Sequence, residues 1–246
     1  MKFLIPLILI IISNSVFSQK KLDFDSTVLV GIDQHVYSQR QIFNDINDNK
    51  YILGLFKGNL TIGAFSISTV SQFNSPNSRG VFVAKYDDNN QIVWLKKIAE
   101  GDTLNNFSTA IDLNNNFVLA YSYSGKINYL SDSAISKGNY DILIIKFDSN
   151  FNLLHKNLIG GTNGEVITEH STTFENNGNY FVCGSFNSTW NGNFQNYKLG
   201  FGNDTIFANN EDLFIAKYDS IGNCLWVKSY GGNGIDGTSF IENYNN

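Results

Sequence analysis

The sequence contains only two cysteines among its 246 residues, which excludes a small scaffold held together by several disulfides. Charged residues are also scarce, at 16%, and acidic residues outnumber basic ones by 22 to 17. This balance argues against a protein that binds nucleic acid through general attraction to phosphates. The 21 glycines follow no triplet period, which excludes collagen.

What the sequence does contain is apolar residues, at 42%, and asparagine, which occurs 35 times. A chain of this length and apolar content can bury a sizeable core and is not a disordered tail. We therefore expect a folded protein.

The first 18 residues have the anatomy of a signal peptide. Lys2 precedes an apolar run over residues 3–12, and a short polar stretch follows with Val16 and Ser18 at the positions where a signal peptidase prefers small residues. Ten apolar residues are too few to span a bilayer as a helix. We expect residues 1–18 to be removed and residues 19–246 to be secreted or displayed at the cell surface, with no integral membrane segment.

Comparison of the sequence with itself reveals a repeat. Three segments align without a gap, and the stretch Val81–Lys97 is identical to Leu213–Ser229 at 7 of 17 positions. The recurring lysines are 61 and 71 residues apart, and an aromatic or imidazole ring follows each of them nine residues later. These positions are Lys85, Lys146 and Lys217, followed by Trp94, His155 and Trp226.

Each repeat holds four short apolar runs separated by turns rich in Asn, Asp and Gly, a pattern typical of antiparallel strands joined by hairpins. The third run is apolar on both faces, so its sheet must be sandwiched between neighbouring sheets. A link of constant length that begins with an aspartate joins the third run to the fourth. The first two runs are residues 41–46 and 51–56 in the first repeat, 108–113 and 117–123 in the second, and 171–174 and 180–186 in the third. The links begin at Asp87, Asp148 and Asp219.

The stretch Asp141–Asp148, followed by a ring position and then by Gly160-Gly161, resembles the bacterial SBBP-type β-propeller repeat. The resemblance covers roughly residues 41–232. It implies an all-β fold, a β-propeller-like array of four-stranded antiparallel blades with about three complete blades, at approximately 41–101, 103–161 and 164–232. The first repeat departs from the pattern, because Gly80 replaces the aspartate and Ala99-Glu100-Gly101 replaces Gly-Gly. The family carries no defined active site, so the resemblance implies architecture and export.

The two ends of the chain match parts of further repeats. We predict partial strands within 22–33 and 235–246, equivalent to a fourth and a first strand. Three blades do not close a ring, so we expect a fragment of a larger ring, or alternatively a protein that closes by self-association. The family often carries a type IX secretion sorting domain, which the sequence does not show.

The connections between the second and third strands differ most in length and are predicted to form the binding face. The longest connection, 187–212, contains Trp190, Phe194 and Tyr197, which we predict as ligand-binding residues. Exposed rings suit stacking on sugars or anchoring of a protein partner. The alternative is that these rings pack on the blade.

The remaining candidate residues favour structural interpretations. Glu165, Glu169 and His170 together suggest a metal or acid–base site. Glu165 aligns with Asp236 in the linker after Gly-Gly, however, and the other two stand at the entrance to a first strand, so we favour a solvated strand entrance. The stretch 45–49 is rich in oxygen ligands but lacks the glycine and distal glutamate of a calcium loop. The recurring lysines are interpreted as stems that lie along the sheet. The two cysteines are expected to be buried free thiols, and no metal or cofactor is expected.

The sequence thus predicts an exported, non-catalytic β-propeller that acts as a binding or surface scaffold module for an unknown glycan or protein ligand, with no nucleic-acid partner. The alternative is a propeller enzyme, a hydrolase or lyase, that acts on glycans, since fold alone does not decide function.

Overall fold

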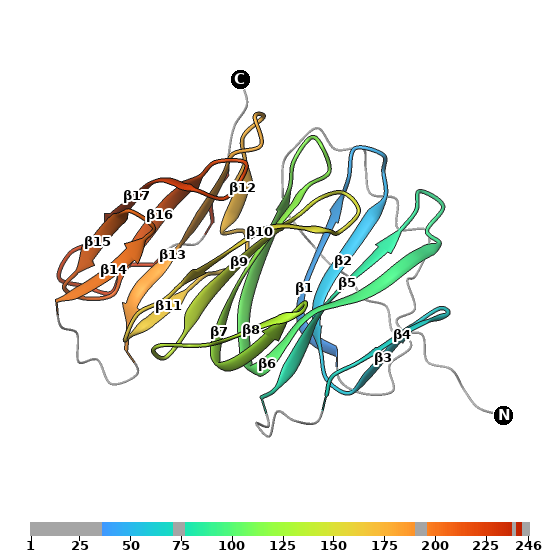
Figure 1. Cartoon of the computed structure of the whole chain (residues 1–246), viewed down its shortest axis with the longest axis horizontal. Helices are drawn as coiled ribbons and strands as arrows, with labels where there is room; N and C mark the ends of the chain where they lie inside the picture. Colours follow the sequence, from blue (N-terminus) through green and yellow to red (C-terminus); the bar gives the residue numbers. More distant parts are fainter. Residues whose placement is uncertain (1–35, 71–76, 190–195, 238–239, 243–246) are drawn as a thin grey trace.

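The computed structural model describes residues 36–70, 77–189, 196–237 and 240–242, and it is all-β, as the sequence predicts (Figure 1). The predicted signal peptide 1–18 and the expected partial strand within 22–33 lie outside the described residues. Within these described ranges no helix is long and apolar enough to cross a membrane. The strands are β1 (Val36–Asn44), β2 (Lys50–Phe56), β3 (Asn59–Ile62), β4 (Phe65–Ser68), β5 (Arg79–Tyr86), β6 (Ile92–Ile111), β7 (Phe117–Tyr129), β8 (Asp132–Ile135), β9 (Asp141–Phe147), β10 (Leu153–Ile159), β11 (Gly164–Val166), β12 (Thr172–Phe174), β13 (Tyr180–Ser188), β14 (Tyr197–Phe201), β15 (Asp204–Ala208), β16 (Asp212–Tyr218) and β17 (Cys224–Tyr230).

An eight-stranded antiparallel sheet in the order β1-β2-β5-β6-β7-β9-β10, with β8 on β7, curls strongly into a half-barrel. Its central strand β6 is 20 residues long, pairing with β5 over its first half and with β7 over its second. We call β1-β2-β5-β6 the first layer and β6-β7-β9-β10 the second. The third layer is a separate sheet in which β11 and β12 pair with β13, followed by β16 and β17. The layers lie side by side from right to left in Figure 1.

Within each layer the four predicted runs are neighbours in chain order, and each adjacent pair is antiparallel. The expected partial strand within 235–246 is not a strand in its described residues. It makes two backbone hydrogen bonds, from Asp236 N to Glu211 O at 2.8 Å and from Ile241 N to His170 O at 2.9 Å.

Every layer also carries a β-hairpin in the connection between its second and third strands, for which the sequence predicts no strands. These hairpins are β3–β4, the end of β7 with β8, and β14–β15. Each has a two-residue turn whose first residue has a positive φ, namely Gly63, Leu130 and Gly202. Alternate residues such as Leu60, Ile127 and Leu199 are buried, because the hairpins fold back onto their sheets.

Three apolar clusters fill the space between these elements. The first lies inside the curl of the large sheet, where Tyr51 and Val83 of the first layer meet Leu119 and Ile145 of the second. The second cluster joins the other face of the second layer to the third layer and its hairpin. The third lies between the first layer and the β3–β4 hairpin. The third strands of the first and second layers, β5 and β9, are therefore buried on both faces, as their composition predicts, whereas in β16 of the third layer buried residues alternate with half-buried ones.

Six turns share one conformation and account for much of the asparagine. The N–H of the first residue donates to the carbonyl of the fifth, and the fourth residue has a positive φ. In five turns the first residue is an aspartate whose carboxylate accepts the N–H groups of the third and fifth residues. Short polar side chains favour such turns by bonding the local backbone. The turns begin at Asp45, Asp87, Asp112, Asp148, Glu175 and Asp219.

In the second and third layers a carboxylate on the third strand faces a glycine that follows the fourth strand. Gly160 lies against Asp141 and Gly231 against Asp212, so closely that a Cβ on either glycine would overlap the carboxyl group. In the first layer Gly80 on the third strand pairs in register with Glu100 on the fourth, although a Cβ on Gly80 would meet Phe56 and Thr69 instead of the carboxylate. The first repeat therefore has its glycine and its carboxylate on exchanged strands.

The carboxylates of Asp141 and Glu100, although they lie on different strands, each accept a backbone N–H group. Asp141 accepts the backbone N–H of Lys137, in the connection between the second and third strands, at 3.1 and 3.2 Å. Glu100 accepts the N–H of Val70, in the corresponding connection of the first layer, at 3.1 Å. In these two layers the carboxylate therefore holds the chain that leads into the third strand.

Candidate functional site

Of the three predicted ligand-binding residues, Trp190 and Phe194 lie outside the described residues. Tyr197 begins β14 and is only 6% exposed, with its ring in the cluster between the second and third layers. Its hydroxyl donates to Glu165 Oε1 at 2.6 Å. The position of Tyr197 thus corresponds to the alternative in which the ring packs on the sheet.

The partner of Tyr197 lies in a buried polar cluster that the sequence analysis did not anticipate. Glu165, on β11, has no exposed surface, so a solvated strand entrance is wrong for this residue. Its second carboxylate oxygen accepts the N–H of Gly161 at 3.0 Å. The Gly161 position requires glycine, because a Cβ there would lie 2.9 Å from Cζ of Tyr197. Glu169 and His170 are exposed, as predicted, so the three residues form no common site.

Burial dominates the chemistry of this cluster. Desolvation raises the pKa of Glu165 to about 8, against the opposing hydrogen bonds from Tyr197 and Gly161. Asp141, 3% exposed, also has a raised pKa, again through desolvation. A protonated carboxylic acid near neutral pH is the feature that a general acid needs, but both oxygens of Glu165 already have partners inside the protein.

A second buried group is Lys146, which is 1% exposed and lies across the boundary between the second and third layers. Its ammonium donates to the carbonyls of Gly178 at 3.0 Å and Ser220 at 3.1 Å, in two turns of the third layer. Burial lowers its pKa. The sequence predicts that the Lys146 side chain lies along its own sheet, which is wrong. Lys146 binds the next layer instead, because the turns there present carbonyl oxygens to its ammonium group.

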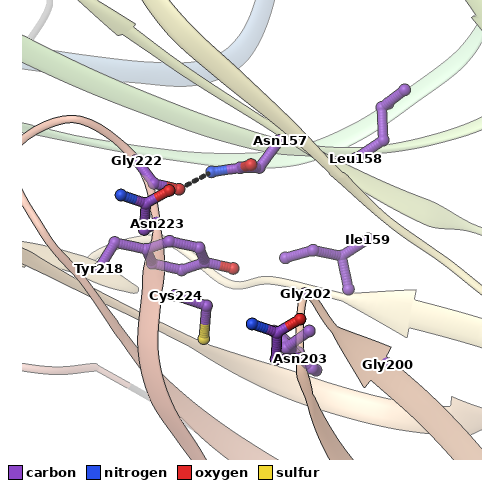
Figure 2. Close-up of a pocket in the computed structure, with 11 residues that line it drawn as sticks. Asn157, Leu158, Ile159, Gly200, Gly202, Asn203, Tyr218, Gly222, Asn223 and Cys224 are labelled. Atoms are coloured by element: carbon purple, nitrogen blue, oxygen red, sulfur yellow. Dashed lines mark hydrogen bonds between the residues drawn. The ribbon is translucent and has the colours of Figure 1, made fainter.

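An open groove lies where the second and third layers meet at their fourth strands (Figure 2). It is bounded by β10, by the turn of the β14–β15 hairpin and by the turn between β16 and β17. We call it the Tyr218 groove; its volume is about 310 Å³. It is lined by Asn157, Leu158, Ile159, Gly200, Phe201, Gly202, Asn203, Tyr218, Gly222, Asn223 and Cys224.

The groove is polar but carries no charged side chain. Asn157 and Asn223 are held in place, by a bond from Asn157 Nδ2 to Gly222 O at 2.9 Å and one from Asn223 Nδ2 to Asp219 Oδ2 at 2.8 Å. The hydroxyl of Tyr218, the thiol of Cys224 and the amide of Asn203 lie around the hollow in Figure 2. Desolvation raises the pKa of Cys224 to about 11, so this thiol is neutral and a poor nucleophile.

A similar hollow recurs one repeat earlier, with a volume of about 450 Å³. It is bounded by Lys97–Glu100 on β6 and by the turn of the β7–β8 hairpin, including Asn128 and Ser131. Here Lys97 and Glu100 form an ion pair of 2.7 Å at the wall. The fold therefore creates a hollow between a fourth strand and the next hairpin turn, and the local side chains decide its charge.

The other sequence predictions concern metals and thiols. Among the described residues no three His, Cys, Asp or Glu side chains gather as a metal site. Asp45 accepts N–H groups of its own turn, from Asn47 and Asn49. Cys183 and Cys224 are free thiols, as predicted, although only Cys183 is fully buried. Strand β16 separates the strands that carry them.

Comparison with protein-family models and with curated proteins gives no match for this chain.

Proposed function

We propose that this protein is an exported, non-catalytic module of the β-propeller type that binds a glycan or protein ligand, or serves as a scaffold, at the cell surface. The observation that carries the proposal is the recurrence of one unit. Each layer has four meandering strands, an inserted hairpin and the same five-residue turns, and each is joined to its neighbour by an apolar cluster. Stacked antiparallel units of this kind are the building plan of propellers.

The behaviour of the recurring polar residues supports a binding role. Asp141, Asp148 and Asp219 accept backbone N–H groups, and Lys146 donates to backbone carbonyls. These groups are committed to holding strands and layers together. Other polar groups line the hollows beside the hairpin turns, among them Asn203 and Asn223 in one and Asn128 and Ser131 in the other, where they suit recognition.

The second candidate, an enzyme acting on glycans, is favoured by one observation, the high pKa of Glu165. A glycosidase uses one protonated and one ionised carboxyl group on either side of the scissile bond. Glu165 has no exposed surface and both its oxygens are bonded, so a substrate would have to displace Tyr197 to reach it. Binding is the better-supported function.

Two measurements test the proposal. The full chain is expressed in a secreting bacterial host beside a variant that lacks residues 1–18, and both are located by cell fractionation. We expect the full chain outside the cytoplasm and the variant inside; the variant outside the cell would contradict the export claim. The purified protein is then incubated with a glycan panel, where release of shortened products that Glu165→Gln abolishes would establish the enzyme instead.

A further inference from the structure

We propose that the Tyr218 groove binds one neutral sugar ring, either a free monosaccharide or the end residue of a glycan. The inference rests on the proposed binding function and names its site and ligand class. The starting point is Tyr218, which is 2% exposed as a residue and whose hydroxyl lies at the hollow (Figure 2). A hydroxyl in this position can both donate a hydrogen bond to a ligand and accept one from it.

The position of Tyr218 is well fixed, so its hydroxyl is a preformed contact. Its ring stacks on Tyr180 with centroids 5.1 Å apart and planes 9° apart. Strand β16, which carries Tyr218, pairs with both of its neighbours along its length. A rigid polar group needs little further ordering when a ligand binds.

The chemistry of the walls selects the ligand. Amide and hydroxyl groups both donate and accept hydrogen bonds, and sugar hydroxyls do the same. Asn203 is exposed at the hairpin turn, and the carbonyl oxygen of Asn223 faces away from the bond that holds its amide nitrogen. Since the lining contains no carboxylate, ammonium or guanidinium group, a charged ligand would gain no ion pair in exchange for its lost hydration.

Size and shape agree with a single ring. About 310 Å³ lies at the lower end of the range of small-molecule pockets. Ile159, which points toward the hollow in Figure 2, supplies an apolar wall for the C–H face of the ring. The hollow one repeat earlier holds the Lys97–Glu100 ion pair instead, so we expect the neutral ligand at the Tyr218 groove alone.

Gly200 allows the groove to be blocked without disturbing the fold. It lines the hollow, and nothing lies within 4 Å of a Cβ built there. Gly200→Trp therefore fills the groove, and Tyr218→Phe removes only the hydroxyl. The matched controls are Gly234→Trp, at a glycine with equally open surroundings, and Tyr121→Phe, which removes a buried hydroxyl from the cluster inside the curl of the large sheet and does not line the groove.

The full chain is titrated with methyl glycosides of glucose, galactose, mannose and N-acetylglucosamine, and with glucuronic acid as the charged comparison, by ligand-observed NMR. We expect millimolar binding of at least one neutral glycoside, weakened about 3- to 10-fold by Tyr218→Phe, abolished by Gly200→Trp and unchanged in both controls. A glycan array with neutral end residues distinguishes the two sources, because tighter binding there than to the methyl glycoside identifies a glycan end.

Three results would overturn the inference: no neutral glycoside bound at 100-fold excess over the protein, preference for glucuronic acid, or binding that survives Gly200→Trp. Glycan-array binding that persists in Gly200→Trp would leave the proposed function standing and remove this site. Product release by the wild type would remove the proposed function whether or not the groove binds.

Discussion

Two adjacent glycines after β17 provide a sharp test of how the carboxylate–glycine pairs work. At Gly231 a Cβ would overlap the carboxyl group of Asp212 and lie 2.8 Å from its Cβ, whereas at Gly232 nothing lies within 4 Å. Because the clash includes the rigid Cβ of Asp212, the carboxylate cannot relieve it by rotation alone. We expect Gly231→Ala to destabilise the protein by about 2 kcal/mol, within the usual range for overpacking, and Gly232→Ala to change stability by less than about 0.5 kcal/mol.

Urea denaturation of both variants measures the difference. The variant Asp212→Gly copies the arrangement at Gly80 and removes the group that the new methyl would strike. Combined with Gly231→Ala it should restore most of the lost stability, with a coupling energy above about 1 kcal/mol. Equal stability of the two alanine variants, or additive effects in the double variant, would refute the assignment of the glycines to carboxylate packing.

Three further predictions concern buried groups. Glu165 keeps its proton up to about pH 8 in the folded protein but loses it near pH 4.5 in the unfolded chain, so its contribution to stability falls as pH rises through this window. In denaturation curves taken between pH 5 and 8, Glu165→Gln should reduce this loss of stability. Burial and the charge of Lys146 lower the pKa of His155 to about 4, so the free energy of unfolding should rise between pH 4 and 6.5 as the imidazole of the unfolded chain loses its proton. His155→Phe should remove this rise, and an unchanged dependence of stability on pH in the variant would contradict the prediction. Trp94 packs on Tyr51 and Phe151, so Trp94→Ala should lower the free energy of unfolding by about 3–5 kcal/mol, and Trp226→Ala by about half of that. Equal shifts of the melting temperature in the two variants would contradict the difference in packing.

The main strands were predictable because their signal is local. Apolar runs between polar turns indicated each strand, and the period of the repeat indicated which strands are equivalent. The inserted hairpins also have a local signal, because Leu60 and Ile62, like Leu199 and Phe201, alternate with polar or small residues directly before a short turn that begins with glycine. Their differing lengths hid the pattern, since they do not align across the repeats.

The site depended on information that one sequence does not hold. Glu165 looks like any other linker carboxylate until the distant Tyr197 is brought to it. Trp94 and Trp226 hold equivalent positions in the repeat and both are half-buried, but Trp94 packs against the cluster inside the curl of the large sheet, whereas within the described residues no further layer packs on Trp226. Register predicts which residues are equivalent, but burial depends on which neighbour is present.

The long strand β6 has a consequence for how the molecule comes apart. Because its 20 residues hydrogen-bond to the first layer over one half and to the second over the other, fraying of either layer removes ladder bonds next to the other, so the two form one cooperative unit. The third layer follows a short non-strand link, residues 160–163, and its backbone meets the second layer at the isolated bridge between Tyr140 and Gly164. Under tension or heat, the chain should therefore yield first at that link, releasing the third layer while the half-barrel stays intact.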